Sequence, residues 1–350
     1  MYLSIPEVFY CKVRYVKQDI LDINYSFFVR ENEYKKIKIG VVLPSSEVKR
    51  WNIAKASMEK EANIKGIKIR VEFSNWDINK EIEIIKVFIL EHIDILILTA
   101  VKLKGGNEIL NEVHKAGIKI IAMDSLIYDS HVDLSVGFNM LKAGELQGSF
   151  LTKKVPEGRY IILHGSPNGE VLKIGAMEYI SPLVYTGKIQ VLADEEVQNW
   201  LSENGYNIIK RIITKDKNID AILAPVDKIA GGAIKALTEE NMQGKVIVTG
   251  QDAEPEAIKR IIEGTQAMTL LNDSIKLGKT TIDLAINLIE GKSINYDYII
   301  NNGKADVISV LIDPILIDEE NVFSKINELI DPLLIDKENV LSKTNELKEQ

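Results

Sequence analysis

Two aspartates mark the places in this 350-residue chain where side chains could bind a small polar molecule. Asp252 ends the run KVIVTGQD, an apolar stretch short enough for a buried strand, and an amphipathic helix begins after Pro255. Asp124 ends a similar run, IKIIAMD. Ligands of open α/β proteins bind at the edge where parallel strands end, because the loops there carry polar groups. The predicted chemistry is hydrogen bonding by carboxylates.

Aromatic and guanidinium groups lie near the same predicted edges. Arg50 and Trp51 follow the first strand pattern, and Trp200 lies in EEVQNWLSEN. A guanidinium group can form two parallel hydrogen bonds with a planar polar group, and an indole ring can pack against the C–H groups of a ligand. A structural alternative makes Arg50-Trp51 an ordinary surface pair, puts Trp200 in the core, and makes Asp124 a turn or capping residue. Trp76, in SNWDINKE, is predicted to be structural or exposed.

The elements that would position these residues follow a regular order. From Lys36 onward, short β-branched runs alternate with helical patterns, which is typical of repeated βαβ units. Strands are predicted near 37–43, 67–73, 93–98, 118–123, 160–164, 189–192, 221–224 and 246–250. Helices are predicted near 50–64, 79–91, 107–115, 171–183, 200–213, 229–239 and 255–263. Two consecutive series of this kind predict two doubly wound α/β lobes.

Composition excludes several classes of function. The net charge of −8 and the lack of a basic stripe argue against nucleic-acid binding. Cys11 is the only cysteine, so no intrachain disulfide is expected. There is no phosphate-binding loop and no G-x-G-x-x-G after a strand, and the four histidines are scattered, so neither catalysis nor a metal or cofactor is predicted.

The amino-acid sequence of several segments resembles that of a known family. GQDAE followed by IKRIIEGTQAMT, together with GELQ at 144–147 and AGGAIKAL at 230–237, is similar to type I periplasmic sugar-binding proteins, most closely D-xylose-binding proteins. The resemblance covers residues 36 to 328. It implies the periplasmic-binding-protein type I fold, in which two Rossmann-like lobes are joined by a hinge of three chain crossings. Such a hinge suits clamshell closure.

The resemblance also implies the sugar-binding residues. It assigns guanidinium contacts to Arg50, ring stacking to Trp51 and Trp200, and hydroxyl contacts to Asp124 and Asp252. Asn168 matches a family loop that contributes an asparagine, and Asn272, at the position of a family lysine, is a further candidate polar contact. The full set is Arg50, Trp51, Asp124, Asn168, Trp200, Asp252 and Asn272.

The chain departs from the family pattern at three polar positions. Ser125 replaces an arginine, Val226 replaces an asparagine, and Asn272 replaces a lysine. Hydrogen bonds to charged groups are worth about 1.5–3 kcal/mol each, so lower affinity or altered selectivity is expected.

The expected domain boundaries follow from the same resemblance. The helix at 273–291 would return to the first lobe, and the strand near 307–311 would return to the second. The crossings would lie near 138–140, 266–271 and 300–303. The expected division is a leader at 1–36, an N-terminal lobe at 37–138 plus 271–300, a C-terminal lobe at 139–266 plus 303–328, and a tail at 329–350.

Both ends of the chain carry unusual segments. Residues 1–36 lack the continuous apolar core of a signal peptide, although the resemblance implies an extracytoplasmic, membrane-associated protein. At the other end, LIDPILIDEENVFSKINE (311–328) recurs as LIDPLLIDKENVLSKTNE (329–346). The second copy is interpreted as a surface helix or frayed tail, with partner docking as the alternative.

The resulting functional hypothesis is a receptor that closes on D-xylose or a related pentose. Its expected partner is a membrane sensor histidine kinase, and the alternative is the permease of an ATP-driven (ABC) sugar transporter. An effector-binding module of a LacI-type repressor shares the fold, but residues 1–36 show no paired-helix pattern that would bind DNA.

Overall fold

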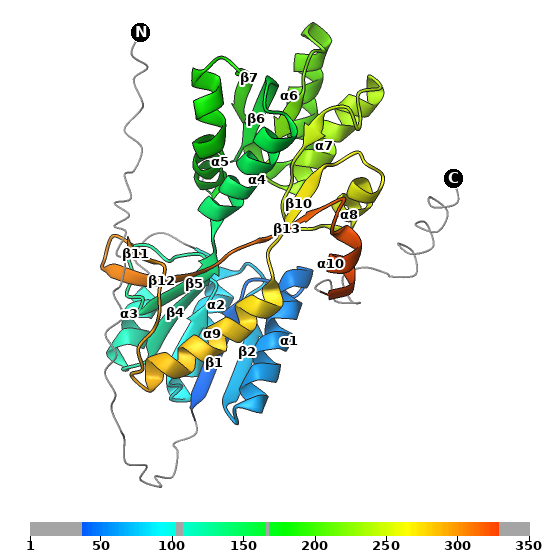
Figure 1. Cartoon of the computed structure of the whole chain (residues 1–350). Helices are drawn as coiled ribbons and strands as arrows, with labels where there is room; N and C mark the ends of the chain where they lie inside the picture. The colour runs from blue at the N-terminus through cyan, green and yellow to red at the C-terminus, as the bar shows by residue number, and fades with distance from the viewer. Residues whose placement is uncertain (1–36, 103–107, 166–167, 329–350) are drawn as a thin grey trace, which may run out of the picture. The chain divides into compact units, whose positions relative to one another are not determined.

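The computed structural model describes residues 37–102, 108–165 and 168–328, and they form two compact units (Figure 1). Unit 1 comprises the residues up to Gly137 together with Ser274–Ile312. Unit 2 comprises Phe138–Asp273 together with the residues from Asp313 onward. The predicted leader, 1–36, and the tail, 329–350, lie outside the described residues. The chain passes from one unit to the other three times.

Unit 1 is built on a seven-stranded sheet of order β11-β12-β5-β4-β3-β1-β2. Its strands are β1 (Lys38–Leu43), β2 (Lys68–Phe73), β3 (Ile95–Leu98), β4 (Lys119–Asp124), β5 (Leu134–Phe138), β11 (Tyr298–Asn301) and β12 (Asp306–Ile312). The pairs from β2 to β5 are parallel, and β11 is antiparallel to β12. The carboxyl ends of β1, β3 and β4 therefore share one edge.

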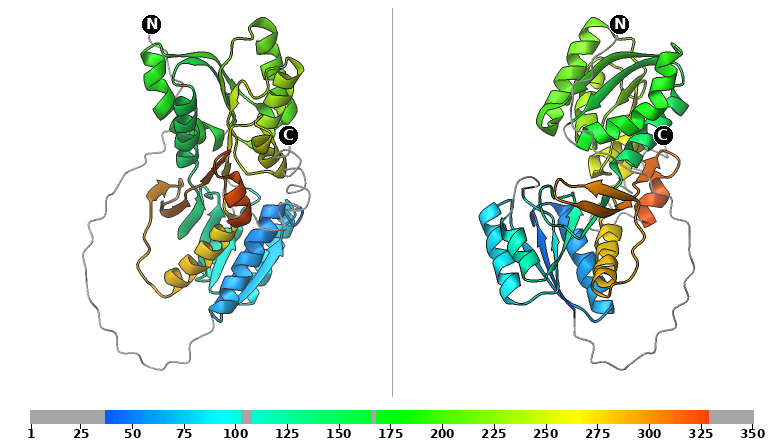
Figure 2. Two further views of the ribbon diagram at one scale, coloured as in Figure 1. Left: turned by 45° about the vertical axis from the view of Figure 1, so that its right-hand side comes forward. Right: turned by 90° about the vertical axis from the view of Figure 1, so that its left-hand side faces the viewer.

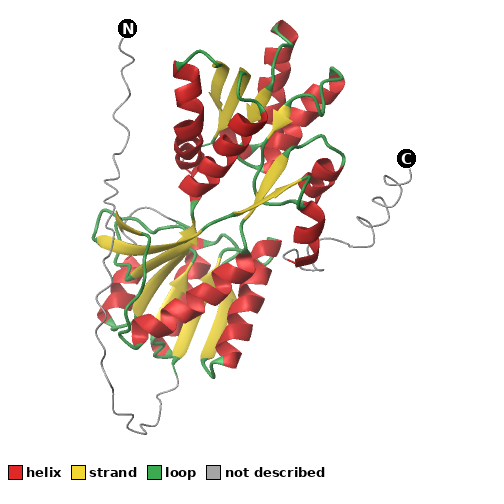
Figure 3. Ribbon diagram, viewed as in Figure 1, coloured by secondary structure: helices red, strands yellow, loops and turns green. Residues whose placement is uncertain are grey.

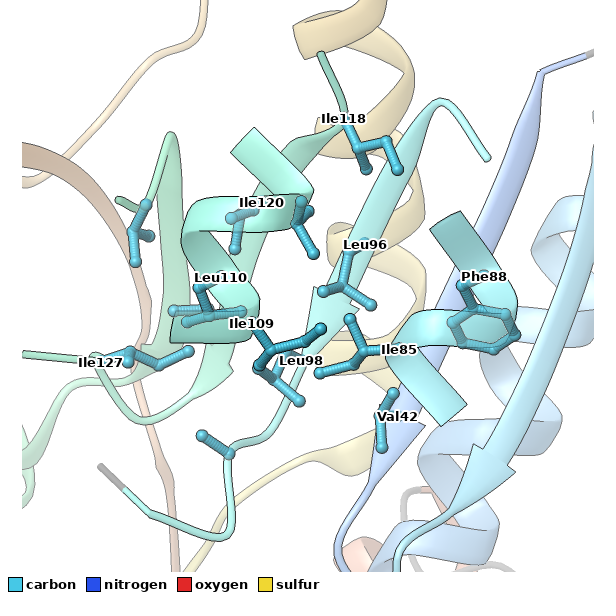
Figure 4. Packing of buried hydrophobic residues seen from close by; sticks show 14 of the residues in the cluster. Val42, Ile85, Phe88, Leu96, Leu98, Ile109, Leu110, Ile118, Ile120 and Ile127 are labelled. Atoms are coloured by element: carbon cyan, nitrogen blue, oxygen red, sulfur yellow. The ribbon is translucent and has the colours of Figure 1, made fainter. Parts of the chain in front are cut away.

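Helices cover both faces of this sheet (Figures 2 and 3). They are α1 (Lys49–Ile64), α2 (Ile78–Leu90), α3 (Glu108–Lys115) and α9 (Ser274–Ile289). α1 packs against α9 on one face, and α2 and α3 cover the other. Between the sheet and α2 and α3, side chains such as Leu96, Phe88 and Leu110 form a fully buried core (Figure 4). Both faces are buried because parallel strands cannot leave one face to water without losing this packing.

Unit 2 contains a four-stranded parallel sheet of order β7-β6-β8-β9 and a separate antiparallel pair, β10-β13. Its strands are β6 (Gly158–His164), β7 (Ile189–Glu196), β8 (Ala221–Leu223), β9 (Ile247–Val248), β10 (Met268–Leu271) and β13 (Ile315–Asp318). Its helices are α4 (Met140–Lys154), α5 (Asn168–Tyr185), α6 (Ser202–Lys215), α7 (Asp227–Glu239), α8 (Pro255–Ile262) and α10 (Val322–Glu328), with a short 3₁₀ turn, η1 (Gln198–Trp200).

The strand β6 shows why unit 2 needs helices on both faces. Its residues Tyr160 and Ile162 pack with α4 and α5, whereas Ile161 and Leu163 pack with α6 and α7. Successive side chains of a strand point to opposite faces, so a strand that is apolar at every position must be covered twice. The fold expected from the sequence, two doubly wound α/β lobes, is confirmed.

One expectation about connectivity is wrong. The strand near 307–311 was expected in the second lobe, but β12 belongs to the sheet of unit 1, beside β11 and β5. The third crossing accordingly falls between Ile312 and Asp313 instead of near 300–303. A β-branched run predicts a strand, but the sheet that it joins depends on pairing partners far away in the sequence.

Candidate functional site

The edge of unit 1 brings together two of the predicted binding residues. Arg50 lies in the first turn of α1, which follows β1, and Asp124 ends β4. The two side chains form a bidentate pair, with Nη1 to Oδ1 at 2.8 Å and Nη2 to Oδ2 at 3.0 Å. The Arg50 side chain is 43% exposed and that of Asp124 is 13% exposed. The pair therefore presents charged hydrogen-bonding groups at the strand ends.

Trp51 is placed differently from the expectation of a ring that is open to a ligand. It is buried, with 2% of its surface exposed. The guanidinium carbon of Arg50 lies 3.8 Å from the centroid of its ring. A guanidinium stacks well on an indole face, so Trp51 supports the orientation of Arg50.

In unit 2, Trp200 follows β7, and its ring lies beside the loop that follows β6. Trp200 is not the first residue of a helix, as the pattern suggested, but ends the turn η1, where Asn199 and Trp200 have φ of 55° and 56°. A Cβ atom on Gly165 would lie 2.5 Å from the indole ring. Only glycine at 165 leaves room for this ring, which is half-buried beside the loop that follows β6.

A charged cluster that the sequence did not indicate lies beside this loop. His164 ends β6, and its Nε2 lies 3.4 Å from a carboxylate oxygen of Asp194, which also accepts a hydrogen bond of 2.6 Å from Lys173. Burial lowers the pKa of His164, and the nearby Lys173 acts in the same direction. The scattered spacing of histidines in the sequence gave no signal for this cluster.

Asp252 is the exposed residue of the loop from Gly250 to Glu254, between β9 and α8, in which Gly250 and Gln251 are buried. Its backbone N–H donates to the carbonyl of Leu270 at 2.8 Å. The carbonyl of Gly250 accepts from Gln147 Nε2 at 3.0 Å, and that of Gln251 accepts from the N–H of Asp227 at 2.8 Å. The exposed carboxylate is therefore attached to a backbone that is held by hydrogen bonds at Gly250, Gln251 and Asp252.

Three predicted residues have an unusual backbone. Asp124, Trp200 and Asp252 have φ of 71°, 56° and 100°. Non-glycine residues seldom adopt positive φ, and such conformations persist where surrounding structure holds them, often at binding sites. Seven other described non-glycine residues, Trp76 among them, also have positive φ, so this feature agrees with the predicted site without identifying it.

The remaining predicted residues are placed less informatively. Asn168 begins α5, and its side chain lies outside the described part of the structure. Asn272 is half-buried, and its Oδ1 is buried with no hydrogen-bond partner among the described residues. Ser125 and Val226, which replace polar family residues, are half-buried directly after Asp124 and directly before Asp227.

The arrangement is suited to binding polyhydroxylated molecules through paired hydrogen bonds. Within residues 37–102, 108–165 and 168–328, no group of three or more histidine, cysteine or acidic side chains is placed to hold a metal ion. No helix in those ranges is long and apolar enough to cross a bilayer.

Comparisons with known proteins agree with this description. Residues 39–293 match the family described as periplasmic binding protein domain. The D-xylose-binding periplasmic proteins of Haemophilus influenzae and Escherichia coli are each 35% identical to the chain over 292 residues, covering 82% of this chain and 88% of theirs. The multiple sugar-binding periplasmic receptor ChvE of Rhizobium radiobacter is 27% identical over 309 residues, covering 81% and 87%.

A solved structure shows the same fold at low identity. The periplasmic ribose ABC transporter structure from Conexibacter woesei has a TM-score of 0.73 and 20% identity, covering 84% of this chain and 95% of that one. Proteins of this family bind ligands without covalent chemistry, so the chain is a binding protein and not an enzyme. The match over most of the chain and the identity to curated relatives together show that this chain belongs to the periplasmic binding protein family.

Proposed function

We propose that this chain is an extracytoplasmic receptor for a pentose, with D-xylose as its ligand. The observation that carries the proposal is 35% identity over 292 residues to two proteins named for D-xylose binding. The polar groups at the strand ends of both units support it, because carboxylates and a guanidinium suit the hydroxyls of a small sugar.

In unit 1, the sugar would be recognised by Arg50 and Asp124. Their bidentate pair uses both terminal nitrogens of the guanidinium and both carboxylate oxygens. Each carboxylate oxygen has a further lone pair, so sugar hydroxyls can donate to Asp124 without separating the pair. Trp51 contributes through its stacking on Arg50.

In unit 2, the proposed contacts are the ring of Trp200 and the carboxylate of Asp252, with Asn168 and Asn272 as further polar groups. Trp200 offers a broad apolar face for sugar C–H groups, and Asp252 is exposed. Trp200 and Asp252 lie on loops that follow strands, where this fold class binds its ligands.

Isothermal titration with a panel of D-xylose, L-arabinose, D-ribose and D-glucose tests the proposal. We expect saturable binding of one sugar per chain, tightest for D-xylose. The ribose and glucose arms measure selectivity, which the substitutions at Ser125 and Val226 are expected to alter. A flat result for every pentose would refute the proposed function.

We further propose that the membrane partner is a sensor histidine kinase. Three positions have lost a charge or polar group relative to the family pattern, at Ser125, Val226 and Asn272. A sensor requires only that the ligand bind one conformation more tightly than another, which tolerates a weaker site better than capture and delivery do. Co-purification with sensor ectodomains and with permease subunits, each with and without D-xylose, separates the two partners. A sugar-dependent complex with the permease alone would contradict this choice.

A further inference from the structure

Several backbone polar groups of the loop that carries Asp252 have hydrogen-bond partners within unit 2. Gly250 and Gln251 accept through their carbonyls, as described above. The N–H of Ala253 donates to Thr269 Oγ1 at 3.3 Å, and that of Glu254 donates to Asp227 Oδ2 at 3.0 Å. Backbone groups of a surface loop commonly form hydrogen bonds with water. Here they have protein partners.

Asp227 makes several hydrogen bonds to this loop and to the residues around it. It is fully buried at the first position of α7. Its carboxylate accepts from Gln266 Nε2 at 2.7 Å and from Thr269 Oγ1 at 2.8 Å, in addition to the N–H of Glu254. Its own N–H donates to Gln251. One residue therefore ties both sides of the Asp252 loop to α7 and β10.

Neighbouring groups hold Asp227 in turn. Arg260 of α8 donates to the carbonyl of Asp227 at 3.0 Å and to Gln266 Oε1 at 2.8 Å. A Cβ atom on Gly250 would lie 2.1 Å from Asp227 Oδ1, so the loop approaches the carboxylate as closely as a backbone can. A buried carboxylate is costly unless it is fully hydrogen-bonded, and this one has three donors.

We infer that Asp227 is a positioning residue for sugar binding: it does not touch the sugar but holds the Asp252 carboxylate in its binding geometry. This inference rests on the proposed function. A loop that is already ordered loses little conformational freedom when the ligand binds, so its order contributes to affinity. Asp227 is not among the residues that the family resemblance assigns to sugar contact.

The test compares three variants in two backgrounds. Asp227→Asn replaces one acceptor oxygen by an NH2 group, which cannot accept from the donors around it. Thr269→Val removes one donor to Asp227 and the acceptor of Ala253. Thr281→Val is the matched control, because Thr281 is equally buried and, within the described part of the chain, its hydroxyl donates only to the carbonyl of Leu277 in α9. Each is made in the wild-type chain and in Asp252→Asn, which retains a hydrogen-bonding side chain.

Two measurements are made on every variant. D-xylose titration gives the affinity, and hydrogen exchange without sugar gives the protection of the amides of Ala253 and Glu254. We expect Asp227→Asn and Thr269→Val to weaken binding by about tenfold in the wild-type background. In the Asp252→Asn background, we expect each variant to lose less than about twofold in affinity, because the effects of residues that act through one group are not additive. Exchange at 253 and 254 should accelerate, and Thr281→Val should change neither quantity.

Specific results would overturn the inference. Equal losses of affinity in both backgrounds would mean that Asp227 only stabilises unit 2. Unchanged exchange at Ala253 and Glu254 would mean that it does not hold the loop. If Asp227→Asn fails to fold, Thr269→Val gives the same two readings. If the wild-type chain binds no sugar, the proposed function fails, and the exchange result alone still decides whether Asp227 orders the loop.

Discussion

The two strand-end edges hold their candidate binding groups in different ways. In unit 1, Arg50 and Asp124 hold each other through a side-chain ion pair that is partly open to solvent. In unit 2, the Asp252 loop is held through its backbone by a buried network centred on Asp227. An exposed pair is adaptable and screened by salt, whereas a buried network is rigid and insensitive to it. The binding groups of unit 1 are therefore expected to adjust to a ligand, whereas those of unit 2 are expected to be already in position before it binds.

Two buried carboxyls extend this contrast. Glu81 of α2 is fully buried and accepts from the N–H of Val101 at 2.8 Å, while its Oε1 has no partner among the described residues. Asp227 has three donors. Burial raises the pKa of Glu81 to about 7 and that of Asp227 to about 8. Glu81 holds the segment after β3 by a single hydrogen bond, so it restrains that segment less than the network around Asp227 restrains the Asp252 loop.

The largest expected effect comes from removing the exposed carboxylate of unit 2. Asp252→Ala should weaken D-xylose binding by at least about 100-fold, because two lost hydrogen bonds to a charged group are worth about 1.5 kcal/mol or more each. Isothermal titration measures it. The control is Asp216→Ala, which removes a surface aspartate paired with Arg159. Full affinity in Asp252→Ala would defeat the assignment of Asp252.

The next effect concerns the pH dependence of stability. The folded chain keeps a proton on Glu81 up to about pH 7, whereas the unfolded chain releases it near the ordinary value of 4.5. The stabilising contribution is therefore complete below about pH 4.5 and is lost as pH rises to 7, at about 1.4 kcal/mol per pH unit.

Glu81→Gln should reduce this dependence, to which Asp227 also contributes, and should raise the stability at pH 8 relative to the wild-type chain. Urea unfolding at pH 5 and pH 8 measures both effects. Glu83→Gln, an exposed change in the same helix, is the matched control and should leave the slope unchanged. An unchanged slope in Glu81→Gln would show that the proton is not held there.

A smaller effect is expected for the ion pair of unit 1. Arg50→Lys keeps the charge but loses the bidentate geometry with Asp124 and the stacking on Trp51, so D-xylose affinity should fall by about tenfold. Titration at two salt concentrations shows whether the residual binding depends on ionic strength. Arg70→Lys, at a pair on β2 with Glu72, should have no effect on affinity. Equal losses in both variants would point to general destabilisation.

The smallest effect concerns the ring of Trp200. Gly165→Ala places a methyl group where the indole lies, so the ring must move, and the affinity should fall by about threefold to tenfold. Trp200→Leu should cause a similar loss, and the double variant should lose no more than either alone. Trp76→Leu, which changes a 58% exposed tryptophan of unit 1, is the control. Additive losses would separate Gly165 from Trp200.

Local patterns predicted much of the fold correctly. The periodicity predicts β1 near 37–43 and α8 near 255–263, and both lie there within two residues. These predictions succeed because apolar spacing and local capping act over short segments. The periodicity does not predict α4, although the GELQ segment within it carries part of the family resemblance. Its Gln147 bonds the carbonyl of Gly250, a contact that joins residues 103 positions apart.

Some features of the candidate site were likewise predictable from the sequence, and others required the tertiary structure. The sequence by itself determined the residue types at the strand ends, Asp124 and Asp252 among them, because a strand that ends in a polar residue is visible in the chain. Only the tertiary structure decided that Trp51 is covered by Arg50 and that β12 joins the sheet of unit 1. The role of Asp227 also required the fold, since its donors come from Glu254, Gln266 and Thr269. Those positions are distant in the chain, and packing alone brings them to one carboxylate.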